Sequence, residues 1–268
     1  MSANAIEKNQ TQEFKNVKYI LTSSMRTLIL VVLYNNRKNL NEIRDELKKP
    51  SATILHGLKE LEDNNLIKKD RKYYELTSNG YLLATNIIKL IDNWYSLEKN
   101  KYFWNNHDLS GIPENFLNKL YLLKDAQFIS STTSDLSNAF NKYIELISTT
   151  SELTIMIPIY SENHLKYLIK LLKDGNLKRL NLLINREILR TIKRSRYLKK
   201  SLLEHENVNI HETDENFKIF LTFCKDFMTL TLFFKDNHYD DSQIIIDKNK
   251  SGIKWSEELF KYYKGRTI

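Results

Sequence analysis

Cysteine, glycine, proline and long apolar runs are all scarce in this sequence, and each scarcity excludes something. The 268 residues include one cysteine, Cys224, so an internal disulfide framework cannot form and a thiolate metal cluster is not expected. With only 6 glycines and 3 prolines, long flexible linkers are not expected either. The longest apolar run, Leu28 to Tyr34, is too short to span a bilayer. The N-terminus lacks the apolar core of a signal peptide. These absences predict a cytoplasmic protein without membrane contact.

What the sequence does have is enough apolar residues for a core and an excess of positive charge. Hydrophobic residues make up 41% of the chain and charged residues 28%, which suits a folded protein of one large or two ordinary domains. The formal net charge is +8. A basic balance favours a polyanionic partner, either nucleic acid or a membrane surface.

The first 80 residues predict helices followed by a hairpin. Apolar spacing predicts helices over Val17–Tyr34 and Leu40–Leu47, and a third over Ser51–Asn64 after a break at Pro50. Leu66–Leu76 then reads as a short hairpin with a cationic tip. This order is that of a winged helix-turn-helix domain, which we place at residues 1–80.

The third helix has the two faces that DNA recognition requires. Ile54, Leu58 and Leu61 share one side and are expected to pack on the domain. The opposite side offers side chains suited to base edges in the major groove, and the hairpin offers cations suited to phosphates. The candidate DNA-binding residues are Ser51, Thr53, His56, Lys59, Lys68, Lys69, Arg71 and Lys72. Glu60, Glu62 and Asp63 are expected to point outward as well, which would keep the second half of the helix away from phosphate.

Each of these features also has a less specific interpretation. A helical histidine such as His56 is more often an ordinary surface residue than a base reader, and a basic hairpin is usually only solvated. A minority of winged helices are protein-interaction modules that do not bind a DNA sequence, and this is the alternative function. The ordered combination of helices and basic hairpin favours double-stranded DNA as the partner.

Residues 81–105 predict a linker helix that joins two copies of the chain. Leu83, Ile87, Leu90 and Trp94 recur at helical spacing. A small winged helix has no remaining surface to cover such a stripe, so we expect a homodimer through this segment. A dimer would present two recognition helices to a pseudo-palindromic site.

Residues 106–268 predict a mixed α/β domain. The apolar runs Leu153–Ile159 and Leu180–Ile184, with a helix over Glu162–Lys173 between them, indicate a βαβ-like unit. Further strands and a closing helix are expected at Val208–His211, Lys218–Cys224, Met228–Phe234, Gln243–Ile246 and Ile253–Tyr263. The fold class is therefore α+β or α/β, with the winged helix-turn-helix domain first.

A basic stretch and an incomplete motif in this second part carry the remaining hypotheses. Residues 165–200 hold twelve Lys or Arg against two acids, much of them in one expected helix that begins near Arg186. A solvated helix face is the common interpretation. Arg186 and Arg190 could instead hold an anionic effector, or the helix could add a nonspecific DNA contact. His164 and Lys166 begin a phosphodiesterase motif, but Leu171 stands where that motif needs an acid, and no second copy exists. We therefore expect no enzyme, no cofactor and no metal.

Three segments carry a resemblance to known regulators. The stretch SATILHGLKELEDNNLIKKDRKYYELTSNGYLLA resembles the recognition helix and wing of archaeal winged-helix regulators related to the arsenical repressors. The stretches FWNNHDLSGIPENFLNKLYLL and SGIKWSEELFKYYK resemble the methanogenesis-regulatory (Fil-type) transcriptional regulators of archaea. The resemblance covers nearly the whole chain. It implies a transcriptional regulator with a C-terminal domain that senses a small-molecule effector, and it implies neither catalysis nor a known ligand.

Overall fold

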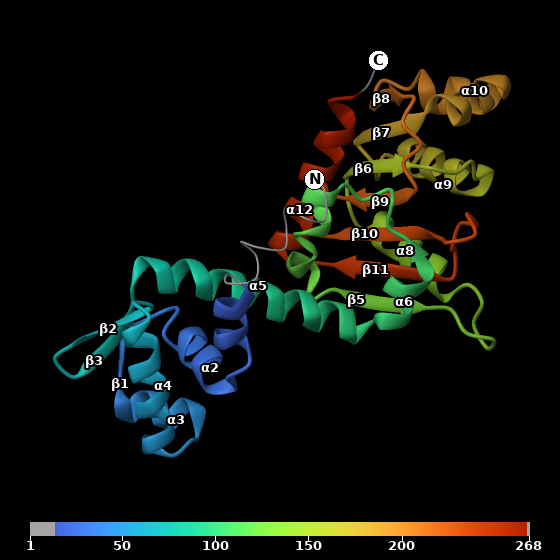
Figure 1. Cartoon of the computed structure of the whole chain (residues 1–268). Coiled ribbons are helices and arrows are strands. Elements are labelled where there is room, and N and C mark those ends of the chain that lie inside the picture. The colour runs from blue at the N-terminus through green and yellow to red at the C-terminus, as the bar shows by residue number, and fades with distance from the viewer. Residues whose placement is uncertain (1–13, 267–268) are drawn as a thin grey trace, which may run out of the picture. The chain divides into compact units, whose positions relative to one another are not determined.

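The computed structural model describes residues 14–266 and separates the chain into two compact units (Figure 1). The first unit runs to Ile91 and the second is Asp92–Ile268. The division falls inside helix α5 (Ser78–Lys99), within the segment that the sequence analysis assigns to a linker.

The N-terminal unit is a winged helix-turn-helix, as predicted. After a helix over 14–21, its elements are α2 (Ser24–Val32), β1 (Lys38–Asn39), α3 (Leu40–Leu47), α4 (Ser51–Asp63), β2 (Ile67–Asp70) and β3 (Tyr73–Leu76). The strands form a small antiparallel sheet in the order β1-β3-β2. Its core joins apolar residues of these four helices to Ile67 and Tyr74 of the wing and to Ala84 and Ile87 of α5.

The prediction of one helix over Val17–Tyr34 is wrong, because the chain breaks before α2. Ser23 has extended backbone angles, and its hydroxyl accepts a hydrogen bond from the Arg26 amide at 3.3 Å. Thr22 turns its hydroxyl back to the Lys18 carbonyl at 2.7 Å. Hydroxyl side chains that bond to nearby backbone compete with helix continuation and favour a cap instead.

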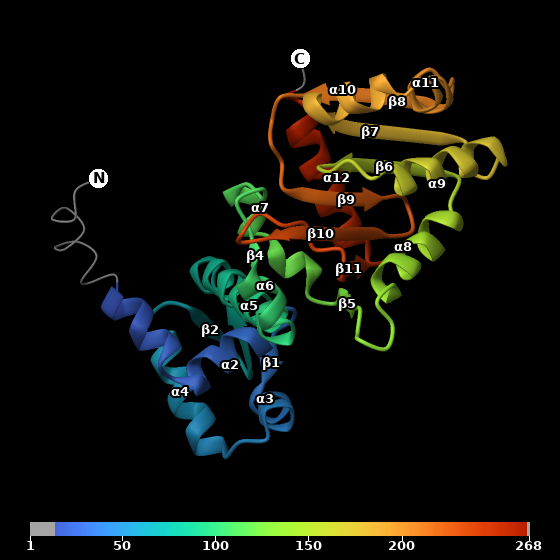
Figure 2. The same ribbon diagram turned by 90° about the vertical axis from the view of Figure 1, so that its right-hand side faces the viewer.

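The C-terminal unit is the predicted mixed α/β domain. Its strands are β4 (His107–Asp108), β5 (Gln127–Ser130), β6 (Glu152–Ile157), β7 (Arg179–Asn185), β8 (Val208–Thr213), β9 (Ile219–Phe223), β10 (Met228–Phe234) and β11 (Gln243–Asp247). Along the sheet the order is β5-β11-β10-β9-β6-β7-β8, and β4 pairs with β10 (Figure 2). The strands β6, β7 and β8 are parallel, as a βαβ unit requires, and the others pair antiparallel.

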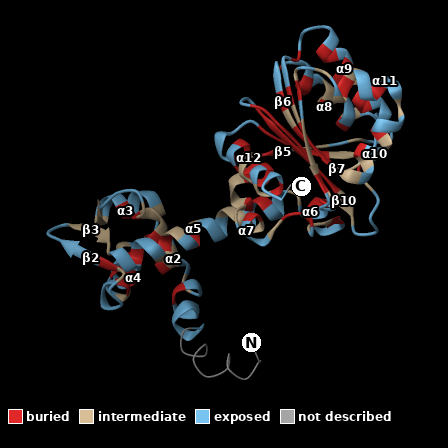
Figure 3. Cartoon of the chain, turned by 90° about the horizontal axis from the view of Figure 1, so that it is seen from above, coloured by how far each residue is buried: buried red, intermediate tan, exposed pale blue. Residues whose placement is uncertain are grey.

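Alternate residues of these strands build a core on each face of the sheet. On one face, Leu153, Ile155 and Ile157 of β6 pack with α8 (Asn138–Ser148), α9 (Glu162–Lys173) and α10 (Arg186–Arg194). Met156 of β6 points to the other face, toward α6 (Lys101–Asn106), α7 (Glu114–Leu117), a 3₁₀ turn (Leu120–Leu123) and α12 (Lys250–Lys264). The strands β6, β7, β9, β10 and β11 inside the sheet are accordingly mostly buried (Figure 3).

The basic stretch after β7 is not one helix, which corrects a second expectation. The helix α10 ends before Ser195, whose hydroxyl accepts from the Leu198 amide and starts the short helix α11 (Arg196–Leu198). A π-helical turn over Lys199–Leu203 follows. The positive charges therefore do not line up on one continuous helical face. Within residues 14–266, no helix is both long enough and apolar enough to cross a bilayer.

Candidate nucleic-acid interface

The face of α4 that packs against the N-terminal core is the face that the sequence predicts. Ile54, Leu58 and Leu61 are buried in the N-terminal core. Gly57 lies on the same face, where an added Cβ would come within 2.9 Å of the Ile29 side chain and 3.0 Å of Met25. A larger residue here would have to push the Ile29 and Met25 side chains aside, so α2 and α4 pack closely at this point.

The opposite face of α4 is open to solvent. Thr53, His56 and Lys59 are exposed, and Ser51 at the start of the helix is half-buried. The His56 side chain is 76% exposed, and its Nε2 lies 3.7 Å from a carboxylate oxygen of Glu60. These side chains are free to reach a groove, because none of them is part of the packing that holds the helix.

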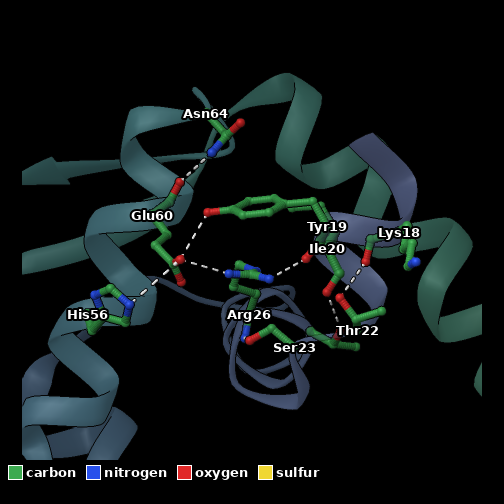
Figure 4. A network of polar contacts seen from close by, with 10 residues as sticks. Lys18, Tyr19, Ile20, Thr22, Ser23, Arg26, His56, Glu60 and Asn64 are labelled. Atoms are coloured by element: carbon green, nitrogen blue, oxygen red, sulfur yellow. Dashed lines mark hydrogen bonds and ion pairs between the residues drawn. The ribbon is translucent and has the colours of Figure 1, made fainter. Parts of the chain in front are cut away.

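Glu60 departs from the expectation that it points outward. Its side chain is only 22% exposed and turns toward α2, where its carboxylate lies 2.8 Å from the Arg26 guanidinium (Figure 4). Tyr19 donates a hydrogen bond to the same oxygen at 3.0 Å, and the Arg26 guanidinium lies 3.7 Å over the Tyr19 ring. Burial opposes ionisation of Glu60, but the hydrogen bonds from Arg26 and Tyr19 outweigh it and lower its pKa.

This network changes the charge that α4 presents. A carboxylate paired with an arginine on the packing side repels phosphate less than a free one on the outer face. Glu62 and Asp63 are exposed at the end of the helix. The acidic part of the outer surface is thus limited to the last turn of α4.

The wing presents cations whose surroundings differ. Lys68 is paired with Glu75 across the hairpin at 2.9 Å, and this hydrogen bond raises the pKa of Lys68 and lowers that of Glu75. Lys69 lies 5.4 Å over the Tyr74 ring. Arg71 has a positive φ of 55° at the tip between β2 and β3. The four predicted wing cations are all exposed.

Arg37 is a candidate that the sequence reasoning missed. Its guanidinium lies 5.1 Å over the Tyr73 ring, and the ammonium of Lys72 lies 5.6 Å over the same ring. Arg37 also lies 3.8 Å from the Asp70 carboxylate. The sequence signal was weak, because Arg37 lies between two predicted helices, and only the pairing of β1 with β3 brings this segment to the wing.

Arg186 and Arg190, the candidate effector residues, line one surface pocket of the C-terminal unit together with Asp214. The Nε of Arg186 lies 2.9 Å from Glu212 and 3.0 Å from Asp214, whereas Arg190 is exposed. Two carboxylates already compensate the Arg186 charge, so an anion would have to compete with them.

The first half of the apolar stripe of α5 is packed, and the second half is exposed to solvent. Leu83 and Ile87 pack against the N-terminal core, so they have a partner within their own domain, contrary to expectation. Leu90 and Trp94 are 56% and 65% exposed, and Ile91 and Leu97 are exposed as well. The apolar surface that needs a partner is therefore the second half of the stripe.

Comparison with family models matches both units to one regulator. Residues 14–94 match the model of the N-terminal domain of the methanogenesis regulatory protein FilR1, and residues 136–266 match the model of its middle domain. The FilR1 protein of Methanothrix harundinacea (strain 6Ac) is 27% identical over 259 residues, which cover 94% of this chain. The chain spans 57% of the length of that curated relative.

Two solved structures give weaker similarities. The archaeal chromatin protein TrmBL2 is 14% identical and aligns over 91% of this chain and 92% of its own, with a TM-score of 0.41. Quinone-bound YodB from B. subtilis is 24% identical and aligns over 31% of this chain and 94% of its own, with a TM-score of 0.30.

Proposed function

Because the chain belongs to the family of the methanogenesis regulatory protein FilR1, we propose that it is a sequence-specific DNA-binding transcriptional regulator and not an enzyme. One observation supports this proposal above all. The exposed face of α4 carries Thr53, His56 and Lys59 free of packing contacts, next to a hairpin whose four cations are exposed. A helix of this kind fits the major groove, and the hairpin fits the flanking backbone.

The two elements have different tasks in this proposal. Ser51, Thr53, His56 and Lys59 contact base edges and set the sequence preference. Lys68, Lys69, Arg71 and Lys72 contact phosphates, and they set affinity and register without specifying sequence. Lys68 contributes less than Lys69 because its ammonium is already paired with Glu75.

The regulator acts as a homodimer in our proposal. Leu90, Ile91, Trp94 and Leu97 of α5 cover one another across the two copies and leave water. Such a dimer places two recognition helices about one helical turn of DNA apart, roughly 34 Å, on a pseudo-palindromic site.

An effector that binds the C-terminal unit regulates DNA binding in this scheme. It must favour one arrangement of the two recognition helices, because a ligand with equal affinity for all arrangements shifts nothing. Arg186 and Arg190 remain candidates for an anionic effector.

The alternative is a winged helix that docks another protein. Leu55 is exposed in the middle of the outer face of α4, and an exposed leucine suits an apolar groove on a protein as well as a thymine methyl group. A gel shift of the intact protein at low salt decides between the two. A retarded complex supports DNA binding, and its absence with all duplexes leaves protein docking as the function.

A further inference from the structure

A cavity in the C-terminal unit lies apart from the basic surface considered for an effector. It has a volume of about 250 Å³ and is lined by residues of α8, the start of α9, the segment after β6, and the strands β9, β10 and β11. Here the parallel strands β6-β7-β8 meet the antiparallel ones. Ligand sites of open α/β sheets commonly lie outside the carboxyl ends of parallel strands, and Ile159 and Ser161, which follow β6, line this cavity.

Aromatic rings form the inner wall of the cavity. Phe220 of β9 lies 5.8 Å from the ring of Tyr143, 5.2 Å from His164 and 6.1 Å from Tyr239. All four rings line the space, together with Phe140. A wall of this kind offers apolar area and, on the ring faces, the negative end of the aromatic quadrupole.

The polar groups of this wall are neutral at physiological pH. The Tyr143 hydroxyl lies 2.8 Å from Nε2 of His164 and 3.2 Å from the Thr222 hydroxyl, with all three side chains buried. Burial lowers the pKa of His164 to about 4, so the imidazole carries no charge. Burial likewise raises the pKa of Tyr143, so its hydroxyl keeps its proton.

The charged side chain among the residues that line the cavity is an acid. None of the lining residues, all of them within the described part of the chain, is a lysine or arginine. Asp241 is the acidic side chain among them, and it is exposed. A carboxylate or phosphate entering this space would lose water without gaining a positive partner.

We propose that this cavity binds a small alkylated ammonium ion, with its apolar body against the rings of Tyr143, Phe220 and Tyr239 and its charge balanced by Asp241. The volume is below the roughly 300–1,000 Å³ typical of ligand pockets, which limits the ligand to a compact molecule. Rings around a quaternary ammonium with a carboxylate at the edge are a recognised solution for binding such cations.

The segment 239–243, which lines the cavity, also contacts the residues that follow α5. Tyr239, Asp241 and Gln243 line the cavity. Asp240, between them, has a carboxylate oxygen 2.9 Å from Nε2 of His107 in the buried interior, and Nδ1 of His107 lies 2.6 Å from the Phe103 carbonyl oxygen of α6. A ligand that shifts residues 239–243 therefore acts on His107 and α6. This regulatory consequence rests on the proposed function, whereas ligand binding itself does not.

The test is isothermal titration of the full chain with a matched series of probes. Choline and tetramethylammonium are the cations, 3,3-dimethyl-1-butanol is the uncharged isostere of choline, and 3,3-dimethylbutanoate is an anion with the same apolar body. We expect choline to bind about five- to tenfold more tightly than the alcohol and the anion not to bind. Absence of binding by both cations, or equal binding of all three choline-shaped probes, would overturn the proposal.

Variants locate the site. Asp241→Asn should weaken choline binding several-fold, toward but not fully to the affinity of the alcohol, because the rings remain. It should leave the alcohol unchanged, whereas Asp226→Asn, an exposed control in the turn between β9 and β10, should change neither. Ile159→Trp should fill the cavity and abolish both. If choline binds equally well to Ile159→Trp, the cavity is not the site. Gel shifts on the same samples separate this outcome from a failure of the DNA-binding proposal, since they need no ligand.

Discussion

The guanidinium of Arg26 in α2 lies 2.8 Å from the carboxylate of Glu60 in α4. This ion pair joins the helix that carries the candidate DNA contacts to the helix beneath it. It also removes one acid from the outer surface of α4. The Arg26–Glu60 ion pair therefore affects both the stability of the N-terminal unit and the charge on the surface that would face DNA.

We predict that Arg26→Met loosens α4. The substitution keeps an apolar stem but leaves Glu60 without its cation, and loss of a hydrogen bond to a charged group costs roughly 1.5–3 kcal/mol. Hydrogen exchange of α4 amides should report a fall of that size in the opening free energy. Arg44→Met on α3 is the control, because Arg44 pairs at 3.4 Å with its exposed neighbour Asp45, and loss of such a surface pair should cost little. Equal effects of the two variants would remove the role assigned to the ion pair.

The wing should control affinity independently of sequence. Lys69→Ala and Arg71→Ala are each expected to weaken binding to every duplex and to reduce the slope of log K against log salt by about 0.9 for each phosphate that the side chain had neutralised. Lys68→Ala should have the smaller effect because Glu75 already pairs with that ammonium. Lys254→Ala, on the exposed side of α12, is the control. Unchanged salt slopes in all variants would argue that the wing does not touch DNA.

The exposed half of the α5 stripe should hold the dimer together. Sedimentation equilibrium should give a dimer for the natural chain and a monomer for Trp94→Glu, because a charge in an apolar interface is costly to bury. Leu136→Glu is the matched control, since Leu136 is 79% exposed and lies outside α5, and it should stay dimeric. A natural chain that sediments as a monomer at micromolar concentration, with one copy bound per DNA, would contradict the proposed dimer.

Acid should weaken the C-terminal unit partly through Asp108. The Lys218 ammonium at 2.7 Å and the Ser110 amide at 2.8 Å lower the pKa of Asp108 from 3.8 to about 2. A carboxyl whose pKa falls on folding stabilises the protein above its unfolded pKa and loses that contribution as the pH drops from about 4 to about 2. The free energy involved is on the order of 2 kcal/mol.

Urea unfolding of Asp108→Asn at a series of pH values measures this contribution. Tryptophan fluorescence is suitable, because Trp94, Trp104 and Trp255 all lie in the C-terminal unit. The variant should be less stable than the natural chain at pH 5, and the difference should shrink toward zero near pH 2. A difference that does not change with pH would show that the carboxylate charge has no part in it.

The spacing of apolar residues and the turn residues predicted the fold, because both depend on interactions between residues close in sequence. The three- and four-residue spacing of Ile54, Leu58 and Leu61 fixes which side of α4 is buried, and the turn residues around Arg71 fix the hairpin. The breaks at Ser23 and Ser195 were missed because a serine is compatible with both a helix interior and a cap, and the choice depends on packing around it.

The candidate site was less predictable where its partners are distant in sequence. Helical geometry places Glu60 near the outer face, but Arg26 lies 34 positions away and turns it inward. The cavity was hidden for the same reason, since its walls come from α8, α9, β9 and β11, which no spacing rule connects. In the sequence, His164 belongs only to an incomplete catalytic motif. In the structure it is a buried, neutral group of the cavity wall.

The central claim is that α4 reads a DNA sequence, and one measurement tests it most directly. Genomic fragments captured by the purified full chain are sequenced, in parallel with fragments captured by Thr53→Ala and His56→Ala and by the control Asp63→Asn. The natural chain and the control should enrich one shared pseudo-palindromic sequence. The two α4 variants should lose preference at particular base pairs, by about 1–3 kcal/mol for each good contact. Even coverage of the genome by the natural chain, or the same preference in all four proteins, would contradict the claim.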